Sequence, residues 1–261
     1  MPGQITLTRT HAGAVAHVTV DHDAKLNTLN PDLMRDFVAA FATLSADPAL
    51  RAVVLTGAGA RAFIGGADIT VMAGIDSEAG GEAFIRLVHA CCRAVRDCPV
   101  PVIARVNGWC LGAGLEVAAA CDLRIAAEGA KFGMPEVRVG IPSVVEAALL
   151  PGLIGWGRTR RLLLLAETIG AAEALDWGLL ERVVPDAALD AAVEAWIGLL
   201  LEAGPEAIRA QKALIRRWED LPLSQAIAAG IYAFAASWRT EEPARMLGGF
   251  LAAKARRAAR D

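Results

Sequence analysis

The chain has 261 residues, of which 55% are hydrophobic and 21% charged, and this composition is that of a folded globular protein rather than a disordered one. Its 26 Lys and Arg against 29 Asp and Glu give a formal net charge of −3, which argues against a nucleic-acid-binding protein. No apolar run is long enough to span a membrane, and the N-terminus shows no signal peptide.

The N-terminal part of the chain predicts two strands followed by a helix. Alternating residues indicate strands over Ile5–Thr8 and Ala14–Val20. Asn30 and Pro31 then supply an N-cap and a first-turn proline for a helix that runs to about Ser45.

The middle of the chain alternates apolar strands and helices. We expect a strand over Arg51–Thr56, a helix over Glu82–Arg96 and a buried strand over residues 100–106. A short small-residue helix, Leu115–Ala120, and a strand, Asp122–Ala127, follow. This order of elements predicts one α/β domain.

From Pro142 onward the pattern is mostly helical, interrupted by the strand-like LLERVVP at residues 179–185. The helices between Asp186 and Ala253 carry much apolar surface, which favours a subunit interface. The basic cluster near the C-terminus is interpreted as the solvated end of a helix, with a contact to a ligand phosphate as the alternative; its residues are Lys254, Arg256, Arg257 and Arg260.

The cysteines and histidines favour free thiols and no metal. The five cysteines are odd in number and have no C-x-x-C spacing, and the four histidines have no metal-ligand spacing. We therefore expect a protein of a reducing compartment, the cytoplasm, without a bound metal.

The stretch LTGAGARAFIGGADI, residues 55–69, permits two interpretations. Gly57, Gly59 and Ala62 match the G-x-G-x-x-G/A dinucleotide pattern after a strand. That fold requires the turn to open directly into a helix, and the pair Gly65-Gly66 would disrupt such a helix. The dinucleotide interpretation, a nucleotide-dependent oxidoreductase, is therefore the remote alternative.

A second small-residue turn occurs in NGWCLGAGLEVAAACD, residues 107–122, where Gly112-Ala113-Gly114 opens the short helix. A helix N-terminus presents unpaired N–H groups, and small side chains permit close approach of another molecule. Two such turns could aim two N–H donors at one carbonyl oxygen and form an oxyanion hole. Two plain, tightly packed turns remain the other interpretation, which composition alone favours.

Two glutamates near these turns favour a catalytic site. Glu116 lies in a helix of apolar and small residues, so we expect it to be partly buried. Glu136 follows a strand and precedes another apolar segment. Burial disfavours a charged carboxylate and raises its pKa toward the range of a working acid or base. Helix electrostatics for Glu116 and an ordinary loop position for Glu136 are the alternatives.

Three motifs resemble the enoyl-CoA hydratase/isomerase, or crotonase, superfamily, in the right order and spacing. They are AFIGGADITVM (62–72), NGWCLGAGLEVAAACDLRIA (107–126) and KFGMPEVRVGIP (131–142). The resemblance extends over nearly the whole chain through DAKLNTL (23–29), LLERVVP (179–185) and FLAAKARR (250–257). It implies a spiral of β-β-α units with a helical C-terminal portion.

The resemblance also assigns site residues by position. It implies that the N–H groups of Ala67 and Ala113 bind the thioester oxygen of an acyl-CoA. It implies a substrate-binding channel at Lys25, Leu26, Gly66, Asp68, Ile69 and Gly112, with Lys25 reaching a phosphate. Coenzyme A would be part of the substrate, and no separate cofactor or metal is implied.

Members that hydrate trans-2-enoyl-CoA carry a glutamate at both the 116 and the 136 positions, as this chain does. The resemblance therefore implies addition of water across the 2,3 double bond, with Glu116 activating the water and Glu136 protonating the α carbon. The alternative is another acyl-CoA enzyme of the same scaffold: an isomerase, dehydratase or hydrolase.

One segment departs from the family pattern. Many hydratases continue after Pro142 with a glycine-rich stretch, where this chain has Ser143-Val144-Val145-Glu146. We expect Val144 and Val145 to narrow or reshape the acyl pocket. Glu146 either lies near the chemistry or is a helix residue that faces solvent, and we favour the second interpretation. The resemblance further implies a core domain over residues 1–200, a trimerisation region over 201–261, and homotrimers or hexamers.

Overall fold

The computed structural model describes residues 3–258, within two compact units, Met1–Ile197 and Gly198–Asp261. The boundary between them falls inside helix α7 (Leu189–Glu202). The division into a core domain (1–200) and a trimerisation region (201–261) stays a prediction. It concerns which part binds substrate and which part forms the trimer. In the described part of the chain, no helix combines the length and apolarity needed to cross a membrane.

The first unit is built on a six-stranded sheet in the order β1-β2-β3-β5-β7-β10. Only the pair β1/β2 is antiparallel, and the other neighbours run parallel. The strands are β1 (Gln4–Thr10), β2 (Val15–Asp21), β3 (Ala52–Gly57), β5 (Val102–Val106), β7 (Leu123–Ala127) and β10 (Arg182–Val184). All six lie at or next to segments predicted as strands.

A second sheet contains four strands of three residues each, in the order β4-β6-β8-β9. It is parallel except for β9 on β8. Its members are β4 (Ala62–Ile64), β6 (Trp109–Leu111), β8 (Lys131–Gly133) and β9 (Thr168–Gly170). Strands this short carry too little period-2 pattern to be recognised in a sequence.

The chain winds between the two sheets in a repeated manner. Three times, a strand of the large sheet is followed by a strand of the small sheet and then by helix. The units are β3-β4 with α2 (Ile69–Met72) and α3 (Glu78–Asp97), β5-β6 with α4 (Ala113–Ala120), and β7-β8 with α5 (Leu150–Leu165). This is the predicted spiral of β-β-α units.

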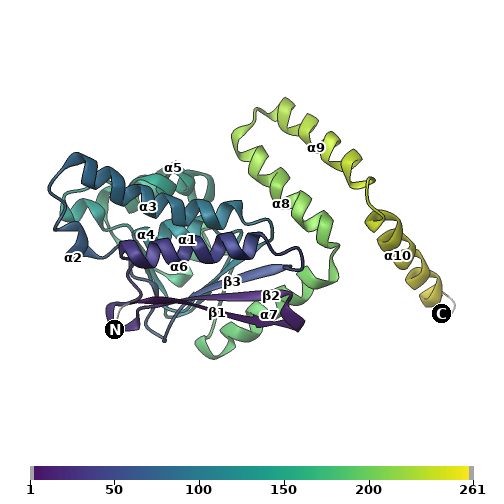
Figure 1. The fold of residues 1–261 in the computed structure, drawn as a ribbon, viewed down its shortest axis with the longest axis horizontal. Coiled ribbons are helices and arrows are strands. Elements are labelled where there is room, and N and C mark those ends of the chain that lie inside the picture. The colour runs from purple at the N-terminus through teal and green to yellow at the C-terminus, as the bar shows by residue number, and fades with distance from the viewer. Residues whose placement is uncertain (1–2, 259–261) are drawn as a thin grey trace. The chain divides into compact units, whose positions relative to one another are not determined.

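Helices α1 (Pro31–Ser45) and α3 lie side by side along one face of the large sheet (Figure 1). The N-cap of α1 is as predicted, since Asn30 Oδ1 accepts a hydrogen bond of 2.9 Å from the N–H of Leu33. Helix α3 begins earlier than predicted because Ser77 caps it, and the Gly80-Gly81 pair in its first turn conceals that start in the sequence.

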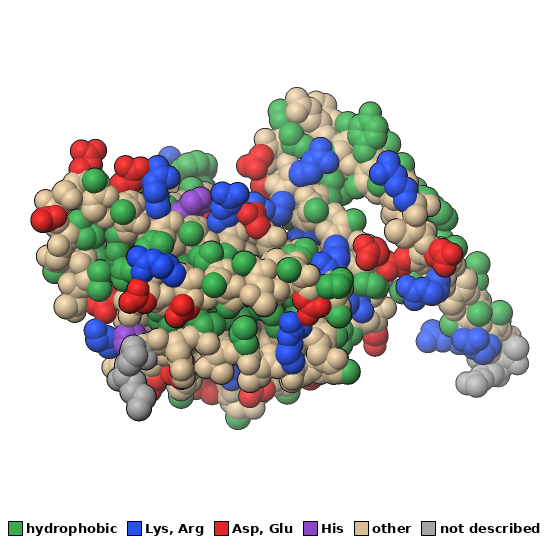
Figure 2. Space-filling model, in the orientation of Figure 1, with side chains coloured by type: hydrophobic (Ala, Val, Ile, Leu, Met, Phe, Trp, Pro, Cys, Tyr) green, Lys and Arg blue, Asp and Glu red, His purple; other side chains and the backbone are tan. Residues whose placement is uncertain are grey.

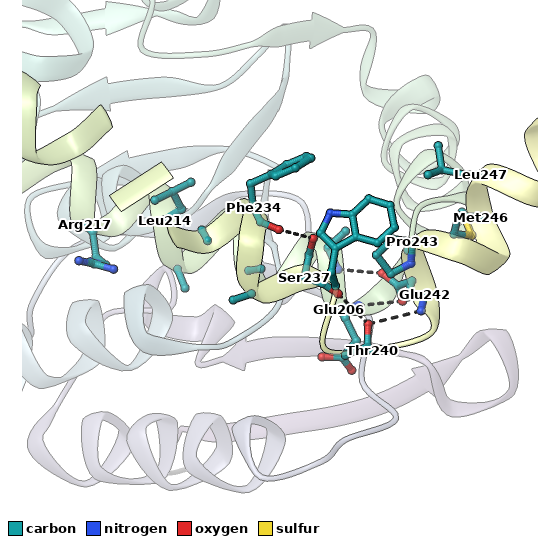
Figure 3. A pocket seen from close by; sticks show the side chains of 17 residues that line it. Glu206, Leu214, Arg217, Phe234, Ser237, Thr240, Glu242, Pro243, Met246 and Leu247 are labelled. Atoms are coloured by element: carbon teal, nitrogen blue, oxygen red, sulfur yellow. Dashed lines mark hydrogen bonds between the residues drawn. The ribbon is translucent and has the colours of Figure 1, made fainter. Parts of the chain in front are cut away.

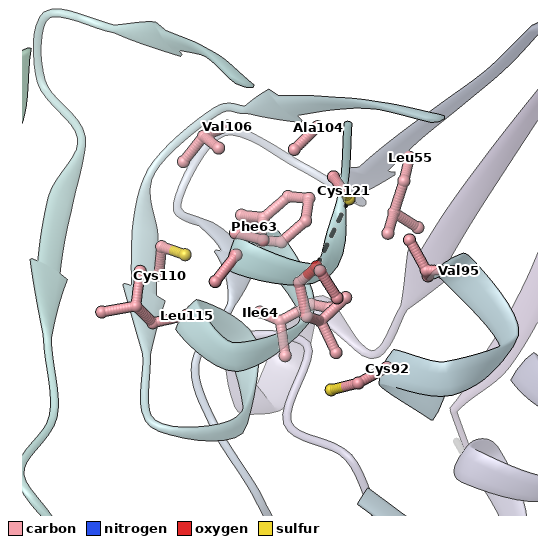
Figure 4. Packing of buried hydrophobic residues seen from close by; sticks show 14 of the residues in the cluster. Leu55, Phe63, Ile64, Cys92, Val95, Ala104, Val106, Cys110, Leu115 and Cys121 are labelled. Carbon is pink, nitrogen blue, oxygen red and sulfur yellow. Dashed lines mark hydrogen bonds between the residues drawn. The ribbon is translucent and has the colours of Figure 1, made fainter. Parts of the chain in front are cut away.

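Helix α4 is buried along its whole length and packs directly on β4. A Cβ on Gly114 would overlap the carbonyl oxygen of Ile64, so only glycine permits this approach. Figure 4 shows Leu115 of α4 among Phe63 and Ile64 of β4 and Cys110 of β6. The close packing fixes the N-terminus of α4 against the end of β4.

The second unit holds α8 (Pro205–Asp220), α9 (Leu223–Ser237) and α10 (Glu242–Ala258). The buried carboxylate of Glu242 caps α8, accepting hydrogen bonds from the N–H groups of Ala207 (2.9 Å) and Glu206 (3.2 Å). These helices border a mainly apolar groove, whose lining includes Phe234 and Trp238 (Figure 3).

The surface of the second unit is rich in apolar side chains. On the face shown in Figure 2, hydrophobic side chains gather on α9. Acidic and basic side chains are scattered over the same face. The most exposed on α9 and α10 are Leu223, Ile231, Tyr232, Phe234, Phe250 and Leu251. In the basic cluster, Lys254, Arg256 and Arg257 are exposed at the end of α10, as predicted, and Arg260 lies outside the described residues.

Candidate active site

The two small-residue turns predicted from the sequence lie against each other. A Cβ on Gly66 would be 3.2 Å from the carbonyl oxygen of Leu111, and a Cβ on Gly112 would be 4.0 Å from Cα of Gly66. Gly112 has φ of +50° and ψ of −122°, a conformation that side chains rarely adopt. The second turn therefore requires glycine at this position, and it opens α4 beside the first.

Each turn carries an N–H group without an acceptor among residues 3–258. The first turn pairs with Leu29 in a parallel bridge: Leu29 N–H donates to Gly66 (2.9 Å), and Asp68 N–H donates to the carbonyl of Leu29 (2.9 Å). The intervening N–H, that of Ala67, is not used. The N–H of Ala113 is also unused, because it is the first residue of α4.

Glu136 lies beside these turns, at the start of the 3-10 helix Glu136–Val139. A Cβ on Gly112 would overlap its Oε1, which places the carboxylate directly against the second turn. Its other oxygen accepts a hydrogen bond of 2.8 Å from the hydroxyl of Ser143. The side chain is half-buried, with Oε2 held by Ser143 and Oε1 next to Gly112.

Glu116, in the first turn of α4, is buried as predicted. Burial, and next the nearby charge of Glu136, raise its pKa from the ordinary 4.5 to about 8. Hydrogen bonding from the backbone N–H groups of Ala147 and Val144 acts in the opposite direction. The structure thus brings two carboxylates close enough for the charge of Glu136 to raise the pKa of Glu116.

Glu146 does not face solvent, and that expectation was wrong. It is buried, its charge also raises the pKa of Glu116, and its Oε1 lies 2.9 Å from Nδ1 of His89 on α3. The sequence pattern could not reveal this, because residues 145–149 form a short 3-10 helix that turns Glu146 inward rather than a regular surface helix.

The predicted channel residues gather near the first turn. Lys25 Nζ lies 3.0 Å from Oδ2 of Asp68, and this hydrogen bond is the main reason that the pKa of Asp68 is lowered. The carbonyl of Leu26 accepts a 2.8 Å hydrogen bond from the N–H of Gly65. Ile69 is 63% exposed, an unusual position for a large apolar side chain and a suitable one for a ligand contact.

Sequence reasoning missed Asn27, which holds the loop 58–62. Its Nδ2 donates to the carbonyls of Ala58 (3.0 Å) and Ala62 (2.8 Å), and its Oδ1 accepts from the N–H of His22. The side chain is fully buried, and its φ is +57°. The signal was the residue type, since asparagine tolerates the left-handed conformation.

The loop GAGARA does not open into a helix. Strand β4 begins at Ala62, so the helix N-terminus that would hold a dinucleotide pyrophosphate is not formed after it. The loop instead connects the two sheets, which removes the structural basis for the oxidoreductase alternative.

The comparisons with known proteins agree with this geometry. The family model "Enoyl-CoA hydratase/isomerase" matches residues 10–252. The chain belongs to the enoyl-CoA hydratase/isomerase family. It is 34% identical to a short-chain-enoyl-CoA hydratase of Clostridium acetobutylicum over 92% of both chains, and 34% identical to a crotonyl-CoA hydratase of Syntrophomonas wolfei over 91% of both.

Among solved structures of the family, an enoyl-CoA hydratase from Bacillus anthracis superimposes with a TM-score of 0.90. It is 30% identical, over 95% of both chains. The family description covers hydratases and isomerases, so the reaction has to be argued from the site.

Proposed function

We propose that this protein is an enoyl-CoA hydratase that adds water across the 2,3 double bond of a trans-2-enoyl-CoA. The observation that carries the proposal is the pair Glu116 and Glu136 beside two unused N–H groups on adjoining turns. Two relatives over most of the chain are named as hydratases of short-chain enoyl-CoA and crotonyl-CoA, which supports the same reaction class.

The N–H groups of Ala67 and Ala113 would bind the thioester oxygen. Addition of water at C3 moves negative charge onto that oxygen as an enolate develops. Preorganised N–H donors stabilise this charge without reorganisation, and loss of one such donor typically costs a factor of about 10²–10³ in rate. Lys25, Leu26, Gly66, Asp68, Ile69 and Gly112 would line the coenzyme A channel. No further cofactor is needed, since addition of water is redox-neutral.

The two glutamates would divide one proton between them. Glu116 accepts a proton from water as the C3–O bond forms, and Glu136 delivers a proton to C2, so the pair keeps one proton throughout. Burial and the charge of Glu136 raise the pKa of Glu116, which suits Glu116 to take up a proton near neutral pH.

The test follows the conjugated thioester absorbance of crotonyl-CoA with wild type, Glu116→Gln and Glu136→Gln. We expect rapid loss with wild type, and losses of activity of about 10²–10⁴-fold in each variant. The exposed Glu128 gives the matched control, Glu128→Gln, which should keep full activity. Full hydration by Glu136→Gln would contradict the assignment.

The same samples separate the alternative reactions. Mass spectrometry distinguishes a product heavier by one water from a shifted double bond or a free acid. Glu146, an additional carboxylate beside Glu116, is the observation that keeps an isomerase, dehydratase or hydrolase as the second candidate.

We further propose a homotrimer, either alone or paired as a hexamer, in the cytoplasm. The exposed apolar side chains of α9 and α10 support association, because apolar surface of this extent is uncommon on a monomer. All five cysteines are free and buried, which supports a reducing compartment. Light scattering on the purified chain measures the mass, and a monomer would contradict the assembly.

A further inference from the structure

The segment that departs from the family pattern touches the proposed catalytic pair directly. It supplies the backbone N–H of Val144, which with that of the next residue, Ala147, acts on Glu116, and the hydroxyl of Ser143, which donates to Glu136. Any displacement of this segment therefore moves groups that contact both carboxylates.

The same segment is strained. Val145 has φ of +38°, and a β-branched residue in that region is a conformational outlier. Such a conformation persists only where surrounding contacts hold it. The turn consequently needs an anchor outside itself.

Glu146 supplies that anchor. Its side chain is only 9% exposed and its Oε1 meets Nδ1 of His89, whose side chain is 49% exposed at the surface of α3. Its Oε2 is buried near Cys92, whose thiol pKa the Glu146 carboxylate helps to raise. Burial of a carboxylate is unfavourable, and the contact with His89 offsets part of this cost.

We propose that His89 and Glu146 form a positioning pair for the proposed hydration: His89 holds Glu146 against α3, and Glu146 holds the strained turn that sets the place of Glu116. Neither residue reacts with substrate. The inference rests on the proposed function only for its kinetic readout, because the state of the turn can be measured without turnover.

The first experiment is hydrogen exchange of the peptide that covers residues 144–149, in wild type, His89→Ala and His89→Asn. Removal of the exposed imidazole leaves the core intact, so the variant should fold. We expect faster exchange in His89→Ala and a return toward wild type in His89→Asn, whose amide N–H replaces the Nδ1 donor. The matched control is His11→Ala, because His11 pairs with Glu194 at 2.7 Å far along the chain from the turn. Unchanged exchange in His89→Ala overturns the proposal.

The second experiment measures kcat and KM for crotonyl-CoA in the same variants. We expect kcat to fall about tenfold in His89→Ala with KM nearly unchanged, since misplacement of a reacting group affects the chemical step. His89→Asn should recover most of the loss. A rise in KM with kcat unchanged would overturn the proposal. If wild type itself is inactive on crotonyl-CoA, the proposed function fails while the exchange result still decides the pair.

The third experiment is the pH profile of kcat in Glu146→Gln. The titratable groups that face Glu116 are Glu136, Glu146 and Cys92. Glu146→Gln removes a negative charge that raises the pKa of Glu116. That pKa should fall, so the alkaline limb of the kcat profile should move to lower pH. Glu194→Gln should leave it in place. A limb that stays unchanged in Glu146→Gln would show that Glu146 does not act on Glu116.

Discussion

Replacement of Gly112 by alanine tests the site most sharply. The new Cβ would overlap Oε1 of Glu136, which would have to withdraw by about 1 Å to reach ordinary contact distance, and a misplacement of about 1 Å can cost about 10²-fold in rate. Withdrawal would also break the 2.8 Å hydrogen bond from Ser143. We expect Gly112→Ala to lose about 10²-fold in kcat on crotonyl-CoA, followed by loss of thioester absorbance.

Two controls separate this effect from backbone strain. Gly13 also has positive φ, +93°, but a Cβ there meets nothing within 4 Å. Gly13→Ala should therefore lose stability by about 1–3 kcal/mol without losing kcat. In a Glu136→Gln background, Gly112→Ala should cost little more, because its effect acts through Glu136. Full additivity of the two substitutions, or wild-type kcat in Gly112→Ala, would refute the reasoning.

Three further predictions concern stability. Gly114→Ala places a Cβ against the carbonyl of Ile64 and should reduce the free energy of unfolding in urea by about 1–3 kcal/mol, whereas Gly81→Ala, with open space around it, should not. The pKa of Glu116 is raised to about 8 in the folded protein, so its contribution to the free energy of unfolding is full below the unfolded pKa of about 4.5 and is lost as pH rises through 8. Glu116→Gln should therefore flatten the dependence of the unfolding free energy on pH. An unchanged dependence would contradict the raised pKa. Glu242→Ala should cost about 1 kcal/mol as a lost helix cap, seen as faster hydrogen exchange in the first turn of α8; unchanged exchange there would mean that the cap contributes nothing.

Long elements with strong local signals could be predicted from the sequence. The helix at Asn30 and Pro31 begins as expected because its cap is a contact between neighbours in the chain. The large sheet followed from runs such as residues 100–106, whose burial on both faces requires continuous apolar side chains. Helix caps and apolar runs involve residues close together in the chain, so the sequence alone reveals them.

The features that failed or were missed depend on contacts across the fold. The four short strands exist only because their partners are in place, and α2 is too short to show a period. The burial of Glu146 was not predicted, because its partner, His89, lies 57 residues away in the chain. Asn27 was overlooked for the same reason, since its hydrogen bonds reach residues 58 and 62.

The two unused N–H groups belong to successive turns of the spiral, one after β4 and the other at the start of α4. Both groups lie on turns whose close packing depends on glycine. By contrast, the segment that bears Val137, Val139, Ile141 and Val144 is irregular and exposed. The buried turns and the exposed valine and isoleucine side chains at 137, 139 and 141 are therefore separate parts of the molecule. Directed evolution confined to these three exposed positions would leave the packing of the two turns unchanged.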